Sequence, residues 1–126
     1  MADIDVSRVL IETARAAGVV VYESLPDDVT KRLPCVVLEE LGDVGLRPDF
    51  HERAGYSYSG FAATKAGAKA VTQAARRAWF AAANLGAVTA GGRMGFFRDD
   101  VHPYPIDTGM SGVFRAVGTC TVSARP

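Results

Sequence analysis

The stretch from Thr64 to Gly86 constrains the fold more than any other part of the sequence. It contains nine alanines, and alanine is the residue that favours helix most strongly. Thr64 can cap the start through its hydroxyl, and Gly86 can adopt the left-handed conformation that ends a helix. Apolar residues recur every three or four positions, at Val71, Ala74, Ala75, Ala78 and Ala82. This pattern predicts one amphipathic helix of about 20 residues, whose shallow face packs against a flat surface.

The composition suits one globular domain that spans residues 1–126. Hydrophobic residues make up 48% and charged residues 22% of the chain, which is enough apolar surface for a packed core. Fourteen basic residues balance fourteen acidic ones, so a general attraction to nucleic-acid phosphates is not indicated. No stretch has the length and apolarity of a membrane span or signal peptide. We therefore expect a protein that is cytoplasmic where it is made, with no membrane partner and no recognition of nucleic-acid sequence.

The two cysteines lie in apolar, strand-like runs. Cys35 and Cys120 are expected to be buried thiols, with a disulfide between them as the alternative. The sequence has no C-x-x-C motif and no Cys/His cluster with zinc spacing. No metal and no cofactor is therefore expected.

Strand patterns lie on both sides of the long helix, and a shorter helix precedes them. The shorter helix is expected at Ile4–Ala17, capped by Asp3 or Asp5. Alternating apolar patterns predict strands at Val19–Glu23, Leu33–Leu41, Arg53–Ala63, Ala87–Ala90 with a continuation at Met94–Arg98, and Val113–Ser123. The order α-β-β-β-α-β-β predicts an α+β fold, in which both helices cover one face of a mostly antiparallel sheet of four or five strands.

Two polar segments are predicted to be irregular. Gly42–Glu52 is glycine-rich and charged, which indicates an exposed loop or long hairpin tip. Asp99–Gly112 contains Pro103, Pro105 and Gly109, which are unfavourable in regular elements. The glycine-rich run Gly91–Gly95 is followed by strand-like phenylalanines rather than by a helix, so it indicates a bulge or hairpin instead of a phosphate cradle.

No group of residues forms a recognisable catalytic motif, so we expect that the protein is not an enzyme. His51 and His102 lie in polar segments, and each could act as a base or metal ligand only if other groups converge on it. Trp79 and Phe80 are adjacent on the long helix and must point about 100° apart, which suggests that one is core and the other contacts a second subunit.

The layout of the whole chain resembles the tail terminator (tail completion) proteins of long-tailed bacteriophages, also described as minor tail protein U-like. Four passages carry the resemblance. They are the first helix with the following run Leu33–Gly42, the strand that continues into the alanine-rich helix at Ala62–Ala78, the variable stretch with prolines, and the closing strand within Gly112–Pro126.

The resemblance implies a structural virion protein without cofactors. Such subunits close into a hexameric ring that caps the tail tube, stops tube polymerisation and provides the surface for head attachment. The implied partners are further copies of the chain, the tail tube protein and the head–tail connector protein, at the head–tail junction of the virion. On this interpretation the candidate interface residues are Asp43, Arg47, Asp49, His51, Arg53, Trp79, Phe80, Arg93, Arg98, Asp99 and Asp100.

Two alternatives remain open from the sequence. The first is another subunit of the head–tail connector or neck, because such proteins share the size and ring symmetry. The second is a small α+β ligand-binding protein or enzyme that uses His51 or His102.

Overall fold

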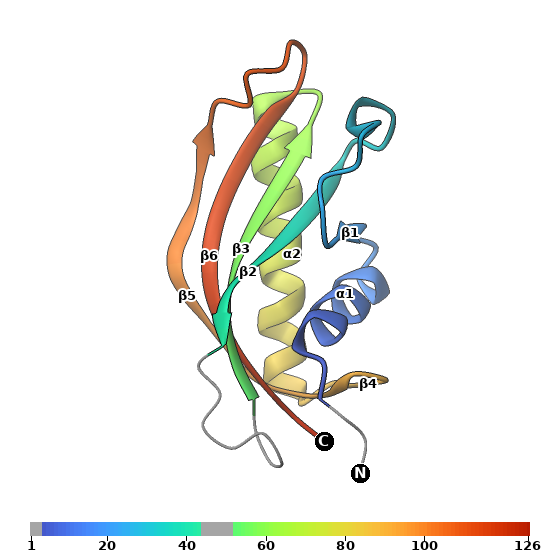
Figure 1. Ribbon diagram of the computed structural model, residues 1–126, viewed down its shortest axis with the longest axis vertical. Coiled ribbons are helices and arrows are strands. Elements are labelled where there is room, and N and C mark those ends of the chain that lie inside the picture. The colour runs from blue at the N-terminus through green and yellow to red at the C-terminus, as the bar shows by residue number, and fades with distance from the viewer. Residues whose placement is uncertain (1–3, 44–51) are drawn as a thin grey trace.

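The structure, a computed structural model, describes residues 4–43 and 52–126 and consists of two helices on one side of a sheet (Figure 1). Two short links, at Ala63–Thr64 and Gly86–Ala87, join the long helix to the strands. The elements in chain order are α1 (Val6–Ala16), β1 (Val21–Tyr22), a 3-10 turn (Val29–Lys31), β2 (Cys35–Asp43), β3 (Glu52–Ala62), α2 (Lys65–Leu85), β4 (Val88–Thr89), β5 (Gly92–Ile106) and β6 (Phe114–Arg125).

The sheet confirms the predicted α+β class and has more strands than expected. Its six strands follow the order β1-β2-β3-β6-β5-β4. Every neighbouring pair is antiparallel except β1 and β2, which are parallel. The count is one higher than the upper prediction because Ala87–Ala90 and Met94–Arg98, expected as one interrupted strand, fall in two separate antiparallel strands, β4 and β5.

Both helices begin at the capping residues that local chemistry favours. The Asp5 carboxylate accepts a hydrogen bond from the Arg8 backbone N–H at 3.1 Å. The Thr64 hydroxyl oxygen accepts one from the Gly67 backbone N–H at 2.9 Å. These bonds satisfy backbone donors that a helix start otherwise leaves without partners. At the end of α2, Gly86 has a φ of 61°, as predicted for a glycine that ends a helix.

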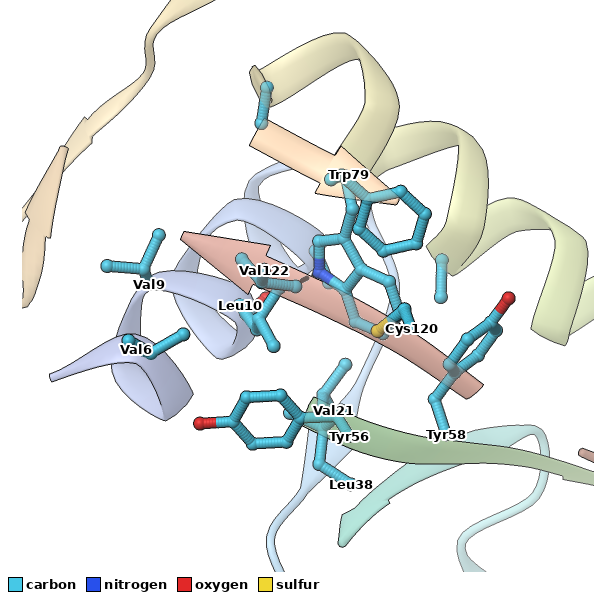
Figure 2. Close-up of a cluster of buried hydrophobic side chains, with 14 of the residues drawn as sticks. Val6, Val9, Leu10, Val21, Leu38, Tyr56, Tyr58, Trp79, Cys120 and Val122 are labelled. Carbon is cyan, nitrogen blue, oxygen red and sulfur yellow. Dashed lines mark hydrogen bonds between the residues drawn. The ribbon is translucent and has the colours of Figure 1, made fainter. Parts of the chain in front are cut away.

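The core lies between the helices and the sheet, and Trp79 of α2 is at its centre (Figure 2). This side chain has no exposed surface, and its indole N–H donates to the Leu10 carbonyl oxygen at 3.0 Å. The ring meets the Tyr58 ring edge-on, with 5.2 Å between the centroids. Trp79 therefore joins α2 to both α1 and the sheet.

The prediction that Asp99–Gly112 is irregular was wrong for the first half of that segment. β5 continues to Ile106, and Pro105 lies opposite Ala116 of β6. Beyond Arg93 the outer edge of β5 pairs with no other described strand, so prolines there remove no ladder hydrogen bond. The pairing of β5 with β6 is not fully regular, because its register shifts twice between Asp99 and Tyr104.

Both cysteines are buried and unpaired, as expected, and they belong to separate clusters. Cys120 packs in the main core, whereas Cys35 packs with Phe61 in a smaller cluster that the segment around Val29 covers. Burial raises the pKa of both thiols. Because the thiolate is the reactive form of cysteine, neither thiol is suited to act as a nucleophile.

Candidate interaction surfaces

A polar cluster joins α2 to β5, and its hydrogen bonds hold the Asp99 side chain in a mostly buried position. The Tyr58 hydroxyl donates to one Asp99 carboxylate oxygen at 3.0 Å, and the Arg76 guanidinium donates to the other. His102 lies 3.8 Å from the same carboxylate, and its second ring nitrogen is 3.2 Å from the Gln73 amide. Burial and the neighbouring Asp99 charge raise the pKa of the Tyr58 phenol, so this group stays protonated and donates. The cluster thus ties the edge of the sheet to the helix.

The sheet face away from the helices carries hydroxyl groups and arginines. Because Cys120 and Val122 point into the core, the alternate residue Thr121 points outward. Arg98 donates to Asp100 at 2.9 Å and to the Thr121 hydroxyl at 3.2 Å, and the Thr121 hydroxyl donates to Asp100 at 2.6 Å. This triangle holds the accessible Arg98 and Asp100 side chains in one arrangement around the buried Thr121 hydroxyl.

The same face is more basic near the ends of β3, β5 and β6. The Arg53 guanidinium lies 5.1 Å from the centroid of the Phe96 ring, an arrangement in which the ring attracts the cation. Arg93 and Arg125 are ladder partners, and both are exposed. Like charges opposite one another on a ladder destabilise the pair slightly, so this end of the sheet suits contact with an acidic group.

An apolar groove lies beside the first half of α2, and we name it the α2 groove. It measures about 750 Å³. The groove is formed by the α1–β1 connection, the two residues before β2, the end of β3 with its link to α2, and one stripe of α2. Its lining contains no charged residue: Ala17, Gly18, Val19, Val20, Leu33, Pro34, Ala62, Ala63, Thr64, Gly67, Ala70, Val71 and Ala74. Val20 is 45% exposed, which is unusual for a valine beside a core.

A second apolar surface lies on the hairpin that connects β5 to β6, and we name it the hairpin patch. Four large side chains on this hairpin are exposed: Tyr104, Ile106, Met110 and Phe114. The hairpin extends past the end of the sheet at the top of Figure 1. The ladder registers place Tyr104 and Ile106 on the face away from the helices and Phe114 on the face of α2, beside Ala62, so these exposed side chains lie on both faces of the hairpin.

The structure places the predicted interface residues in different environments. Arg53, Arg93, Arg98 and Asp100 belong to the open face or its rim, and Asp43 is the last residue of β2. Arg47, Asp49 and His51 lie outside the described residues. Asp99 is only 17% exposed and already bonded within the chain.

Of the aromatic pair, Trp79 is the core residue, and listing it as an interface residue was wrong because its side chain has no exposed surface. Phe80 is half-buried. It packs on Phe97 with 4.7 Å between ring centroids, and the Arg76 guanidinium lies over it. A subunit contact by this pair could therefore come only from Phe80.

Neither apolar surface was predicted from the sequence. The hairpin patch had a signal, since Tyr104 and Ile106 alternate with Pro103 and Pro105 as strand residues do, but the prolines were given more weight. The α2 groove had none, because three segments far apart in the sequence form it.

Two further observations concern metals and membranes. In the described part of the chain, no three His, Cys, Asp or Glu side chains converge as metal ligands would. Neither α1 nor α2, the two helices of residues 4–43 and 52–126, combines the length and hydropathy needed to cross a membrane.

The fold defines a two-layer α+β protein in which two helices cover one face of a six-stranded mixed sheet. One solved structure with this architecture is a chain of the virion of a native gene transfer agent (GTA) particle. It superposes with a TM-score of 0.56 at 19% sequence identity, over 94% of this chain and 85% of that chain. At this identity the similarity concerns the fold. No protein-family model matches the sequence, and no curated protein matches it.

Proposed function

We propose that this chain is a structural virion protein that caps a phage tail tube as a ring, with the hexameric stoichiometry that the family resemblance implies. The observation that carries the proposal is the fold shared with a component of a gene transfer agent virion over 94% of the chain. The sequence resemblance to tail terminators, which covers nearly all 126 residues, agrees with it.

The surfaces of the subunit suit such a role. A ring requires two different contact patches on each subunit, because neighbours meet head to tail. The α2 groove and the hairpin patch are two separate apolar surfaces of this kind. The sheet face away from the helices supplies fixed polar groups, among them the Arg98–Asp100 pair held by the buried Thr121 hydroxyl, for contact with the tail tube or the connector.

Deleting the gene from the genome that produces the particle tests the proposal. Loss of a terminator leaves nothing to stop tube growth, so we expect overlong tubes without heads in electron micrographs. Expression of the wild-type chain from a plasmid should restore uniform tails. Tails of normal length that fail to join heads would instead indicate a connector or neck subunit, and unchanged infectious particles would contradict a structural role.

The histidine-based alternative makes a different prediction. Replacing both His51 and His102 with alanine should leave particle assembly intact, because the structural role depends on surfaces rather than on proton transfer. A loss of particles, with the variant still folded, would count against the structural proposal.

A further inference from the structure

The chain is neutral as a whole, but its charges are unevenly distributed between the two edges of the sheet. α2 carries four basic residues and no acidic one, and its exposed Lys65 and Lys69 form what we name the lysine stripe. At the other edge, the exposed Glu23 after β1 and Glu39 in β2 form what we name the acidic edge. Resting on the proposed function, we propose that the lysine stripe of one subunit contacts the acidic edge of the next copy of this chain.

Contacts further along α2 show which way the lysine stripe faces. Residues four apart lie on one side of a helix, so Lys65, Lys69 and Gln73 share a side. The Gln73 amide lies 3.2 Å from the His102 ring of β5, and Lys65 borders a hollow together with Pro105 of the same strand. The lysine stripe therefore lies at the β5 edge of the subunit.

The lysine stripe has charge to offer to a neighbour. Within residues 4–43 and 52–126, no carboxylate forms an ion pair with Lys65 or Lys69, whereas Arg76 on the same helix is paired with Asp99. Asp107 borders the same hollow as Lys65. Two ammonium groups beside this one carboxylate leave the stripe with a net positive charge.

The acidic edge has the complementary charge. Glu23 and Glu39 border one hollow of about 340 Å³, and in the described part of the chain neither forms an ion pair. Arg115 also borders this hollow, with its guanidinium donating to the Ser59 hydroxyl at 2.9 Å. Two carboxylates beside one guanidinium leave the hollow with a net negative charge, which suits a lysine side chain from a neighbour.

The two charged surfaces lie at one level on opposite edges of the sheet. The ladder row that contains Glu39 crosses β3 and β6 and reaches Val101 of β5. The next residue, His102, contacts Gln73, which is one helical turn from Lys69. β1 and β2 form one edge of the sheet, and β5 lies toward the other (Figure 1). In a flat ring of identical subunits, surfaces placed in this way meet head to tail, which favours a second copy as the partner.

Reversal of charge on each surface tests the contact. Lys65→Glu with Lys69→Glu gives a stripe-reversed variant in which both surfaces are acidic, and Glu23→Lys with Glu39→Lys gives an edge-reversed variant in which both are basic. A single exposed ion pair contributes little, but each double variant replaces attraction by repulsion at two positions. Each variant alone should therefore associate about tenfold more weakly than the wild type in sedimentation experiments.

Mixing the two variants distinguishes this contact from a general effect of charge. In an equimolar mixture every acidic stripe can meet a basic edge, and every remaining lysine stripe can meet an unchanged acidic edge. The mixture should therefore recover most of the wild-type association. A mixture that associates no better than its components, with both variants folded by circular dichroism, would overturn the proposal. So would a wild-type chain that remains monomeric at every concentration.

Arg125→Glu is the matched control for the single variant Lys69→Glu. Arg125 is exposed, and its ladder partner Arg93 begins the strand β5 at the end of the sheet away from Lys65. Both substitutions change the net charge by the same amount. Lys69→Glu should weaken association and Arg125→Glu should not, so equal weakening by the two variants would contradict the proposed contact.

The result is separable from the outcome of the gene deletion. Overlong tails in the deletion strain, together with charge variants that associate as the wild type does, would leave the proposed function standing and remove this contact. Recovery of association on mixing the variants, together with normal tails in the deletion strain, would do the reverse.

Discussion

Gly60 is a residue at which the sheet and α2 approach closely. A Cβ atom built there would overlap the Thr72 hydroxyl and would lie 2.9 Å from the Ala68 carbonyl oxygen. The backbone of α2 cannot yield as a flexible side chain can. Gly60→Ala should therefore separate the two layers and lower the free energy of unfolding by about 2 kcal/mol, as measured by urea denaturation.

Gly55 in the same strand provides the control. A Cβ atom at Gly55 would meet its nearest neighbour at 3.9 Å, an ordinary van der Waals contact. Gly55→Ala should change stability by less than about 0.5 kcal/mol. Equal effects of the two substitutions would mean that the packing between β3 and α2 is not as tight as described.

The buried tyrosines make the protein sensitive to alkali. Burial raises the pKa of both Tyr56 and Tyr58 above the ordinary phenol value of about 10. A group with a raised folded-state pKa contributes stability that is complete below its unfolded pKa and is lost as the pH rises. We therefore expect the free energy of unfolding to fall progressively above about pH 10.

Phenolate absorbance recorded together with near-ultraviolet circular dichroism checks this expectation. The signals of Tyr56 and Tyr58 should appear only when the tertiary signal is lost. Ionisation of all four tyrosines of the chain while the tertiary signal persists would contradict the burial of these phenols.

For a single residue, burial could be predicted from its neighbours in the sequence, but the residues that it contacts in the fold could not. The two buried cysteines were predicted because their neighbours are apolar. The inward position of Asp99 was not, because its partners Tyr58 and Arg76 are 41 and 23 positions away. Long-range pairs of this kind depend on how β5 is placed against α2, which no local pattern specifies.

Among the elements, α2 is the one whose start depends most clearly on a single side chain. Thr64 is exposed, so its main role at this position is the hydrogen bond that its hydroxyl oxygen accepts from Gly67. Thr64→Ala should lower the free energy of unfolding by about 1 kcal/mol. Thr64→Ser keeps the hydroxyl and should restore most of that loss. Identical thermal melting of the two variants would show that the cap does not stabilise the helix.

Helices and paired strands could be predicted because their signals are local. Alanine content and the two caps define α2, and alternation defines β3 and β6. The course of β5 was missed because prolines exclude a central strand but not a free edge, and whether a strand lies at the edge is a property of the whole sheet. The α2 groove could not be predicted for the same reason, since it exists only after three segments meet.

At the scale of the whole molecule, the proposed contact between copies predicts a change in assembly without a change in folding. Ala70→Glu places a carboxylate on an exposed position of the groove lining, where a neighbouring subunit of the proposed ring would bury it. Because an unpaired charge is costly to bury, the variant should remain monomeric in sedimentation experiments under conditions in which the wild type associates. Its thermal melting should match that of the wild-type monomer.

Ala66→Glu is the matched control on the same helix. Ala66 is also exposed, but it does not line the groove. This variant should associate as the wild type does. Loss of association in both variants would show that charge on α2 in general, rather than the groove, controls assembly.

The central claim is that the protein acts by capping a tube through its surfaces. Electron microscopy of growing tail tubes mixed with the purified chain measures this most directly. The account predicts ring-shaped density at one end of each tube, with tube growth stopped there, and no such density with Ala70→Glu. Tubes that keep growing with bare ends, or that carry the protein along their sides, would contradict it.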